Sequence, residues 1–257
     1  MRRFIWLLIV GLFLVCILTV EIKADSNDWQ ENFFRANQAY KAGQYKKAVS
    51  GYKELIRQGV INGHIYYNLG NAYFRMNRFG RAILNYERAH ILIPRDADIN
   101  FNLGQALDRI KDVIPESGGY TSMNFFQLKS LTITEILWAF ACINLLFWTF
   151  LFIRLFSRSE WTYYFMVTFL ALWLMAGASF CLKWYMIATD DRAVILKSEV
   201  DVLAGPDSKD TLLFQLHEGT IVHQERTEDG WKLIRISVKK RGWVKSGALE
   251  LIQPASG

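Results

Sequence analysis

A 34-residue period in the first half of the chain constrains its fold more than any other feature. Small or aromatic residues recur at this interval in several columns: Ala48 and Ala82, Tyr52 and Tyr86, and Ala36, Gly70 and Gly104. Within each unit the apolar residues follow three- and four-residue steps, which is typical of amphipathic helices. Small residues at repeated positions let paired helices approach closely. The period therefore predicts a stack of helix pairs in which each pair buries the apolar face of the next.

Residues 29–112 resemble the tetratricopeptide repeat family. The second repeat carries the family's residue types at Tyr66, Leu69, Gly70, Tyr73, Ala82, Tyr86, Ala89 and Pro94. The first repeat departs from the pattern, because Tyr40 stands one place late and no proline ends the unit. The third supplies only one helix, at about residues 97–111, which we expect to form a terminal cap with a polar outer face.

The resemblance implies a concave groove that receives a peptide or a helix of a partner protein. Groove-facing positions of the family correspond here to Phe33, Asn37, Tyr40, Lys41, His64, Tyr67, Asn71, Phe74 and Arg75. Some family members clamp a terminal carboxylate with basic residues and asparagines. Asn37 and Asn68 fit such a clamp, but Asp98 and Asn102 stand where basic residues should be, which argues against it. The aromatic residues of this set have an alternative reading as core, since they follow helical spacing.

Two uncharged runs, residues 136–153 and 161–182, predict a pair of transmembrane helices. As helices they span roughly 27 and 33 Å, and neither shows the polar stripe of a buried globular helix. The link between them carries Arg154 and Arg158, which favours a cytoplasmic turn. Residues 1–24 have the layout of a signal peptide or an uncleaved anchor. We expect residues 113–134 to form a linker and juxtamembrane segment, and both soluble modules to lie on the noncytoplasmic side.

Residues 190–252 show the period-two pattern of short strands separated by turn residues. About five short strands favour a small closed barrel, since closure removes exposed edges. The segments Leu216–Thr220 and Gly242–Val244, with Trp231 between them, resemble bacterial SH3-like domains. That resemblance implies recognition of a protein segment or of a cell-wall peptide.

Charge, cysteine and histidine usage exclude several classes of function. The net charge is +6, but no basic stripe with interleaved aromatics appears, so no nucleic-acid binding is expected. All three cysteines lie within apolar runs, which leaves no thiolate metal site or cysteine nucleophile in the soluble modules. The four histidines form no ligand pattern, and no phosphate-binding glycine loop is present. We expect no catalytic site, no metal and no cofactor.

The order of the parts resembles the BatE-type proteins of the aerotolerance (Bat) group. The predicted fold class is multi-domain: an all-α tetratricopeptide array, a two-helix transmembrane hairpin and a small all-β SH3-like barrel. The resemblance implies a multi-pass protein of the bacterial inner membrane with both soluble domains in the periplasm. It also implies partnership with von Willebrand A-domain membrane proteins and a MoxR-type ATPase in envelope stress. Two functions stay open: an interaction scaffold, or a protein that binds peptidoglycan and senses the wall.

Overall fold

The computed structural model describes residues 28–112, 128, 130–157, 159–237 and 239–253. The predicted leader at 1–24 and most of the predicted linker at 113–134 lie outside these residues. The helices are α2 (Asp28–Lys41), α3 (Tyr45–Arg57), α4 (Gly63–Arg75), α5 (Phe79–Leu92), α6 (Ala97–Leu107), α7 (Ile133–Phe156) and α8 (Glu160–Ala188). The strands are β1 (Arg192–Ile195), β2 (Glu199–Leu203), β3 (Leu212–His217), β4 (Ile221–Glu228), β5 (Trp231–Ser237), β6 (Lys240–Lys245) and β7 (Leu249–Leu251), with the 3-10 turn η2 (Ser246–Ala248) before β7.

The described chain forms two compact units. One holds helices α7 and α8, and the other combines helices α2 to α6 with the whole β-sheet.

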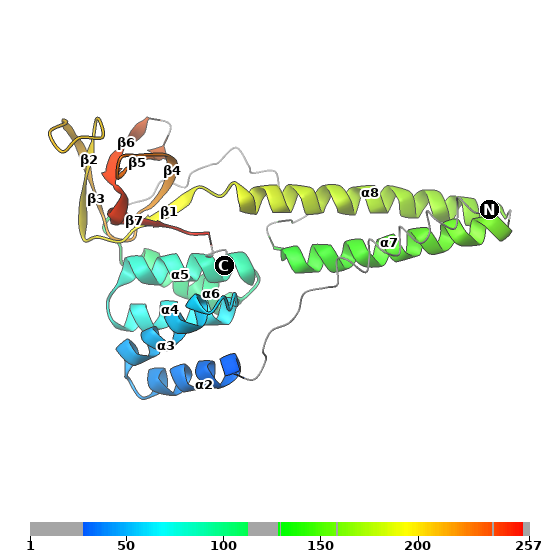
Figure 1. Cartoon of the computed structure of the whole chain (residues 1–257), viewed down its shortest axis with the longest axis horizontal. Coiled ribbons are helices and arrows are strands. Elements are labelled where there is room, and N and C mark those ends of the chain that lie inside the picture. Colours follow the sequence, from blue (N-terminus) through cyan, green and yellow to red (C-terminus); the bar gives the residue numbers. More distant parts are fainter. Residues whose placement is uncertain (1–27, 113–127, 129, 158, 238, 254–257) are drawn as a thin grey trace. The chain divides into compact units, whose positions relative to one another are not determined.

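Helices α2 to α6 stack in sequence order and form the repeat array (Figure 1). Tyr52 of α3 and Tyr86 of α5, 34 residues apart, are both fully or almost fully buried. Ala48 and Ala82 lie one turn before them and have no exposed surface. The columns that the sequence predicted as helix contacts therefore form the core of the array.

The same period fixes where the helices begin and turn. Asn62 and Asp96 are the N-caps of α4 and α6, and each side chain accepts a hydrogen bond from the backbone N–H two residues later. Such caps satisfy donors that the first helical turn leaves free. Gly43 and Asn77 both adopt positive φ angles, 73° and 55°, in the turns between paired helices. Glycine and asparagine are the residues that tolerate this conformation best.

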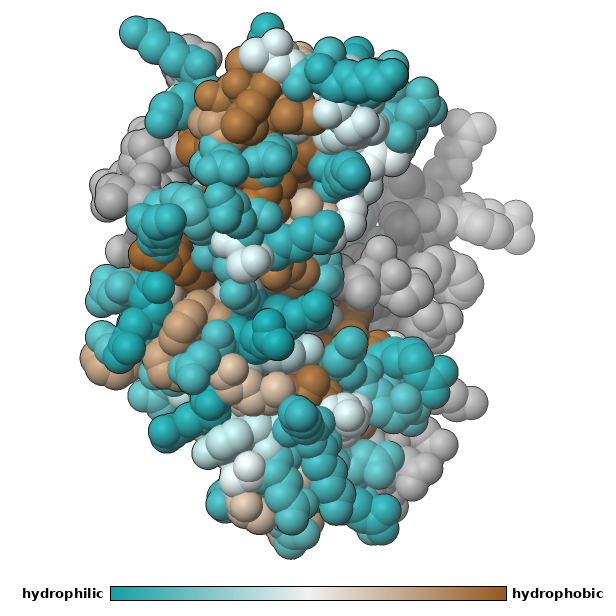
Figure 2. Space-filling model, turned by 90° about the vertical axis from the view of Figure 1, so that its left-hand side faces the viewer, coloured by the Kyte–Doolittle hydropathy of each residue, from teal (hydrophilic) through white to brown (hydrophobic). Residues whose placement is uncertain are grey.

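The sheet contains seven antiparallel strands in the order β3-β2-β6-β5-β4-β1-β7. Strands β3 and β7 are its edges, so the sheet is open and a closed SH3-like barrel is not confirmed. Its core gathers the inward-facing aliphatic residues of all seven strands and η2: Ala193, Ile195, Val200, Val202, Leu216, Val222, Ile234, Val244, Ala248 and Leu249. Figure 2 shows one face of the molecule, mostly hydrophilic, with hydrophobic side chains gathered toward its upper part.

The repeat array and the sheet share a hydrophobic core. Val194 and Ile252 belong to the same buried cluster as the alanines and tyrosines of the array. A side chain at Gly80, in the first turn of α5, would place its Cβ 2.8 Å from the carbonyl oxygen of Ile195. A Cβ at Gly219 would lie 2.3 Å from Ile110. Both glycines therefore permit a close approach between the array and the sheet.

Charged side chains also join α5 to the sheet. Arg192 of β1 donates hydrogen bonds to Glu87 at 2.9 Å and to Asp190, and the Glu87 side chain is only 9% exposed. Burial lowers the pKa of Arg192, but its two carboxylate partners outweigh burial and raise it, so the ion pair stays charged. Arg88 of α5 pairs with Glu250 and donates to the carbonyl oxygen of Leu251 at the β7 edge.

A third contact lies where the array ends. The carboxylate of Asp112 accepts hydrogen bonds from the backbone N–H of His217 at 2.7 Å and from the hydroxyl of Thr220 at 2.6 Å. Its other oxygen lies 2.8 Å from Nδ1 of His217, and Lys111 contacts the second ring nitrogen. The segment after α6 is thereby fixed to the β3–β4 turn.

Helix α6 is therefore not the free end of the array that the sequence predicted. Its apolar residues Leu103 and Leu107, together with Ile110, pack against the shared core that includes strand residues. A Cβ at Gly70 would lie 2.7 Å from the ring of Tyr86, but nothing lies within 4 Å of one at Gly104. Within the described residues α6 is the last helix of the array, and residues of the sheet pack against its end.

Helices α7 and α8 form an antiparallel pair that is long and apolar enough to cross a membrane. Their mean hydropathies over an 18-residue window are 2.2 and 2.0. Few of the side chains in these windows are buried, whereas the core helix of a soluble protein would be mostly buried. A capping box between Thr132 and Glu135 begins α7. Phe150 of α7 stacks on Phe165 and Phe169 of α8, with ring centroids 5.2 and 5.1 Å apart.

Candidate protein-binding site

The first helices of the three repeats, α2, α4 and α6, present matching residues on one surface. At four-residue steps each helix carries an aromatic residue, an amide and a cation. We call this surface the repeat face; it consists of Phe33, Asn37 and Lys41 on α2, Tyr67, Asn71 and Arg75 on α4, and Phe101, Gln105 and Arg109 on and just after α6. All nine residues are partly or fully exposed.

A ladder of asparagines and tyrosines connects these helices. Oδ1 of Asn37 accepts hydrogen bonds from the hydroxyl of Tyr52 at 2.6 Å and from Nδ2 of Asn68 at 3.0 Å. One repeat later, Oδ1 of Asn71 accepts from Tyr86 at 2.7 Å and from Asn102 at 3.1 Å. The ladder explains why a buried tyrosine faces a half-exposed asparagine in each repeat.

This ladder fixes the orientation of the two acceptor amides. Burial raises the pKa of Tyr52 and of Tyr86, with a smaller contribution from a neighbouring tyrosine, so both hydroxyls stay protonated and donate. Oδ1 of Asn37 receives all the hydrogen bonds recorded for that side chain in the described residues, so its Nδ2 group remains available as a donor. Asn71 also has a hydrogen bond with the hydroxyl of Tyr67, and because an amide nitrogen carries two hydrogens, one N–H of Asn71 remains for a ligand. Two such donors, one repeat apart, suit the carbonyl oxygens of an extended peptide.

Tyr40 and Phe74 contribute to packing between paired helices. Tyr40 lies 5.5 Å from Tyr45, and Phe74 lies 5.5 Å from Phe79, measured between ring centroids. Both are half-buried, and Tyr40 also takes part in a hydrogen bond with Arg75. These two predicted groove residues therefore hold the turns of the repeats.

The other predicted residues are accessible. Lys41, His64 and Arg75 are exposed, whereas Phe33 and Tyr67 are half-exposed and pack on the buried tyrosines of α3 and α5. His64 stands at the first turn of α4, and its backbone N–H is capped by Asn62. Within the described residues no group of three or more histidine, cysteine or acidic side chains is arranged to hold a metal ion.

Sequence reasoning missed the third row of the repeat face. Phe101, Gln105 and Arg109 follow Tyr67, Asn71 and Arg75 by 34 residues, and Phe101 is 67% exposed. The period itself could have found them. Interpreting residues 97–111 as a terminal cap with a polar outer face excluded them from the predicted groove.

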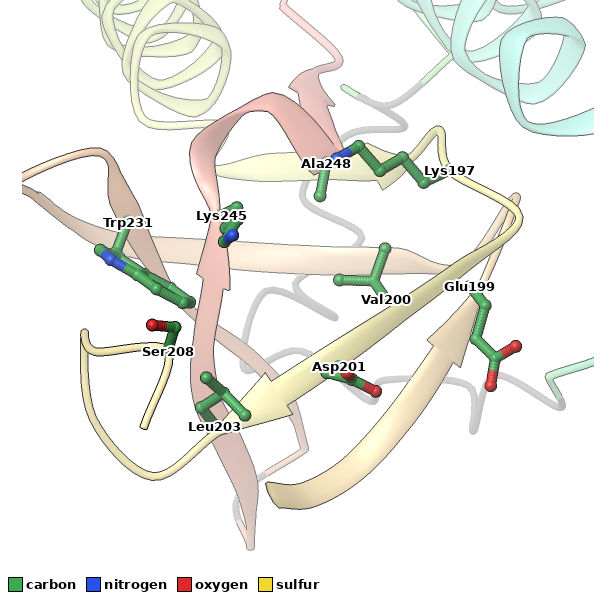
Figure 3. Close-up of a pocket in the computed structure, with 9 residues that line it drawn as sticks. All are labelled: Lys197, Glu199, Val200, Asp201, Leu203, Ser208, Trp231, Lys245 and Ala248. Carbon is green, nitrogen blue, oxygen red and sulfur yellow. The ribbon is translucent and has the colours of Figure 1, made fainter. Parts of the chain in front are cut away.

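The sheet has a separate hollow of about 270 Å³ beside Trp231 (Figure 3). Its lining combines two lysines, two carboxylates and a hydroxyl with an apolar floor: Lys197, Lys245, Glu199, Asp201, Ser208, Val200, Leu203 and Ala248. Nζ of Lys245 lies 5.8 Å from the centre of the Trp231 ring. Charges of both signs around an indole can receive a ligand that carries both an ammonium and a carboxylate.

Comparison with known families agrees with the repeat period. A sequence model of the tetratricopeptide repeat family matches residues 65–96, which are α4, α5 and their connection. No curated protein matches the chain. The matched segment, the equivalent packing of α2 and α3, and the half-repeat at α6 together make residues 28–112 a tetratricopeptide-like helical array, a kind of structure that binds other proteins.

Proposed function

We propose that this protein is a non-enzymatic, membrane-anchored interaction scaffold that binds protein partners through the repeat face. The observation that carries the proposal is the pair of partly exposed asparagines, Asn37 and Asn71, which the ladder holds in equivalent positions on a surface that the sheet leaves uncovered. The sheet packs on α5 and on the segment that follows α6, so it covers that end of the array. The repeat face stays exposed.

Membrane anchoring by α7 and α8 is supported by their length and hydropathy. The shared core adds an argument about topology. Residues 28–112 and 189–253 belong to one compact unit, which supports their placement on the same side of a membrane. Two crossings allow that placement and one does not. Arg154 at the end of α7 favours a cytoplasmic turn, which leaves the array and the sheet in the periplasm.

Alkaline phosphatase fusions test this orientation, since the enzyme is active only outside the cytoplasm. We expect activity for a fusion after Thr189 and none for a fusion after Ser157. The reverse pattern would overturn the proposed orientation.

The biological setting that we propose is the Bat aerotolerance group of the bacterial envelope. The order of array, hairpin and C-terminal sheet supports it. The partners would then be membrane proteins with von Willebrand A domains and a MoxR-type ATPase system, and the C-terminal sheet would correspond to the SH3-like domain of that group.

Site-specific photocrosslinking tests the scaffold function. Phe101 on the repeat face is replaced by a photoreactive phenylalanine analogue, and Ile61 in the α3–α4 loop, which is 51% exposed, serves as the control position. In native membranes we expect defined protein adducts at position 101 and none at 61. Equal capture at both positions, or no adduct at 101, would refute binding through this face.

The second candidate function is binding of a cell-wall peptide in the hollow beside Trp231. The lining of opposite charges favours it, because wall peptides carry both amines and carboxylates. The test uses the full chain in detergent, since the sheet shares its core with α5. Retention on purified peptidoglycan that is lost on Trp231→Ala would support this function. Retention unchanged by the substitution would exclude the hollow as the site.

A further inference from the structure

We propose that the repeat face binds an extended acidic segment of a partner, whose acidic side chains lie over Lys41, Arg75 and Arg109. The inference rests on the scaffold function proposed above and adds the chemistry of the partner. It concerns side-chain carboxylates along a segment, not a carboxylate at a chain end.

The arrangement of the three cations carries the inference. Each stands eight residues after the aromatic residue of its row and four after the amide, so the cations share one margin of the repeat face. They recur at 34-residue intervals on neighbouring helices that the asparagine ladder holds together. The opposite margin carries the three aromatic rings, and the amides lie between.

These cations are available to a ligand. All three side chains are exposed, and within the described residues none lies in salt-bridge distance of a carboxylate. Arg75 has a hydrogen bond with the hydroxyl of Tyr40, which holds it in place without neutralising it. Other arginines of the array behave differently: Arg35 and Arg57 form ion pairs within their own helices.

Negative charges nearby set the orientation of the segment. Asp98 and Asp108 are both exposed at the α6 end of the face. Asp98 lies on the aromatic side: burial and then the charge of this carboxylate raise the pKa of Tyr67, although a hydrogen bond with Asn71 opposes the rise. Asp98 repels an acidic ligand on the aromatic side, whereas Lys41, Arg75 and Arg109 attract its carboxylates to the cationic margin, where Asp108 offsets part of the charge of Arg109.

The spacing of the helices defines the pattern of the ligand. Packed helices lie roughly 8–10 Å apart. Three residues of a chain in the polyproline II conformation span about 9 Å and complete one turn, so every third side chain lies on the same face. Acidic residues at every third position can therefore meet one cation each, while backbone carbonyls accept from Nδ2 of Asn37 and Asn71.

Helix stability offers a competing explanation for two of these cations. Lys41 and Arg75 stand in the last turns of α2 and α4, where a positive charge interacts favourably with the helix dipole. That explanation predicts a change in thermal stability and no effect on any ligand. It does not account for Arg109, which lies beyond the end of α6.

The test uses the full chain in lipid nanodiscs and isothermal titration calorimetry. The probe is a nine-residue peptide, (Glu-Phe-Ser)3, with acetylated and amidated ends, and (Lys-Phe-Ser)3 is the matched cationic peptide. We compare the triple variant K41E/R75E/R109E with K46E/K47E/K53E, which makes the same charge change on α3. Thermal unfolding of both variants checks that they fold.

We expect the acidic peptide to bind, the cationic peptide to bind at least about tenfold more weakly, and the affinity to fall with added salt. The repeat-face triple should weaken binding by about tenfold or more, and the α3 triple by less than about threefold. If the repeat-face triple does not fold, Arg109→Glu alone should still weaken binding. No binding of the acidic peptide, equal binding of both peptides, or equal loss in both triples would overturn the inference. If any of these results is obtained while photocrosslinking at position 101 still gives defined protein adducts, the acidic-ligand inference is wrong and the scaffold function is still supported.

Discussion

The two glycines Gly70 and Gly104 occupy equivalent places in the repeat, yet we expect opposite effects when each is replaced by leucine. A Cβ at Gly70 would lie 2.7 Å from two ring atoms of Tyr86 and 3.3 Å from the carbonyl oxygen of Ala82. Nothing lies within 4 Å of a Cβ at Gly104. The first repeat accommodates the single methyl of Ala36 at this place, so leucine is the informative substitution.

The magnitudes follow from packing and helix propensity. Overpacking a fitted core costs about 1–3 kcal/mol. Displacing the Tyr86 ring also breaks its 2.7 Å hydrogen bond to Asn71, which is worth about 1 kcal/mol. Leucine in place of glycine in a helix returns about 0.8 kcal/mol. Gly70→Leu should therefore destabilise the unit by about 1–3 kcal/mol, whereas Gly104→Leu should stabilise it by about 0.5–1 kcal/mol.

Thermal and urea unfolding of the full chain in detergent, followed by circular dichroism, measure the pair. For a unit of this size each kcal/mol shifts the midpoint by about 2–4 °C. The two variants should thus differ in sign as well as in size. The reasoning is refuted if both substitutions lower the midpoint equally, or if Gly70→Leu leaves it unchanged.

Two further substitutions test the contact between array and sheet. Arg192→Met leaves the nearly buried carboxylate of Glu87 without its cation and should lower the free energy of unfolding in urea by about 2–3 kcal/mol. The control Arg35→Met, at an exposed ion pair, should change the free energy of unfolding by less than about 0.5 kcal/mol. Similar losses in both variants would contradict a stabilising role of the Arg192–Glu87 pair. Burial raises the pKa of Asp112, but hydrogen bonds from the hydroxyl and amide groups of the β3–β4 turn outweigh it and hold that pKa below its usual range. A carboxylate with a lowered folded-state pKa contributes stability that is fully present above its unfolded pKa of about 4 and is lost as the pH falls through the folded value. Asp112→Asn should therefore destabilise the unit at pH 7, with a difference that shrinks below about pH 4; a difference that is independent of pH would be inconsistent with this assignment.

Local features of the fold could be read from the sequence because they repeat. Tyr52 and Tyr86 are buried as their equivalent positions predict, and Asn62 and Asp96 cap equivalent helices. The alternation of apolar and polar residues likewise predicted strands in the C-terminal segment. Closure of those strands into a barrel depends on long-range pairing, which alternation does not encode, and the structure has an open sheet.

Contacts between distant segments could not be predicted. Gly80 and Glu218 are 138 positions apart, and Arg192 and Glu87 are 105 apart. A lone arginine at a strand start or a glycine in a helix gives no local signal of its partner. The sequence therefore presented the array and the sheet as separate modules, although they share one core.

The central claim is that the array and the sheet form one body on the outer side of the membrane. A cysteine pair tests it in a chain whose native cysteines are replaced: Lys111→Cys with His217→Cys, at two side chains that contact each other at 2.9 Å. Lys53→Cys with His217→Cys is the control, and a protease site within residues 113–127 lets a bridge between the halves be seen on a gel. A short, membrane-impermeant crosslinker with two thiol-reactive groups, applied to intact spheroplasts, should bridge the first pair and not the second. A bridge that forms only after lysis, or none although each single cysteine reacts, would contradict the account.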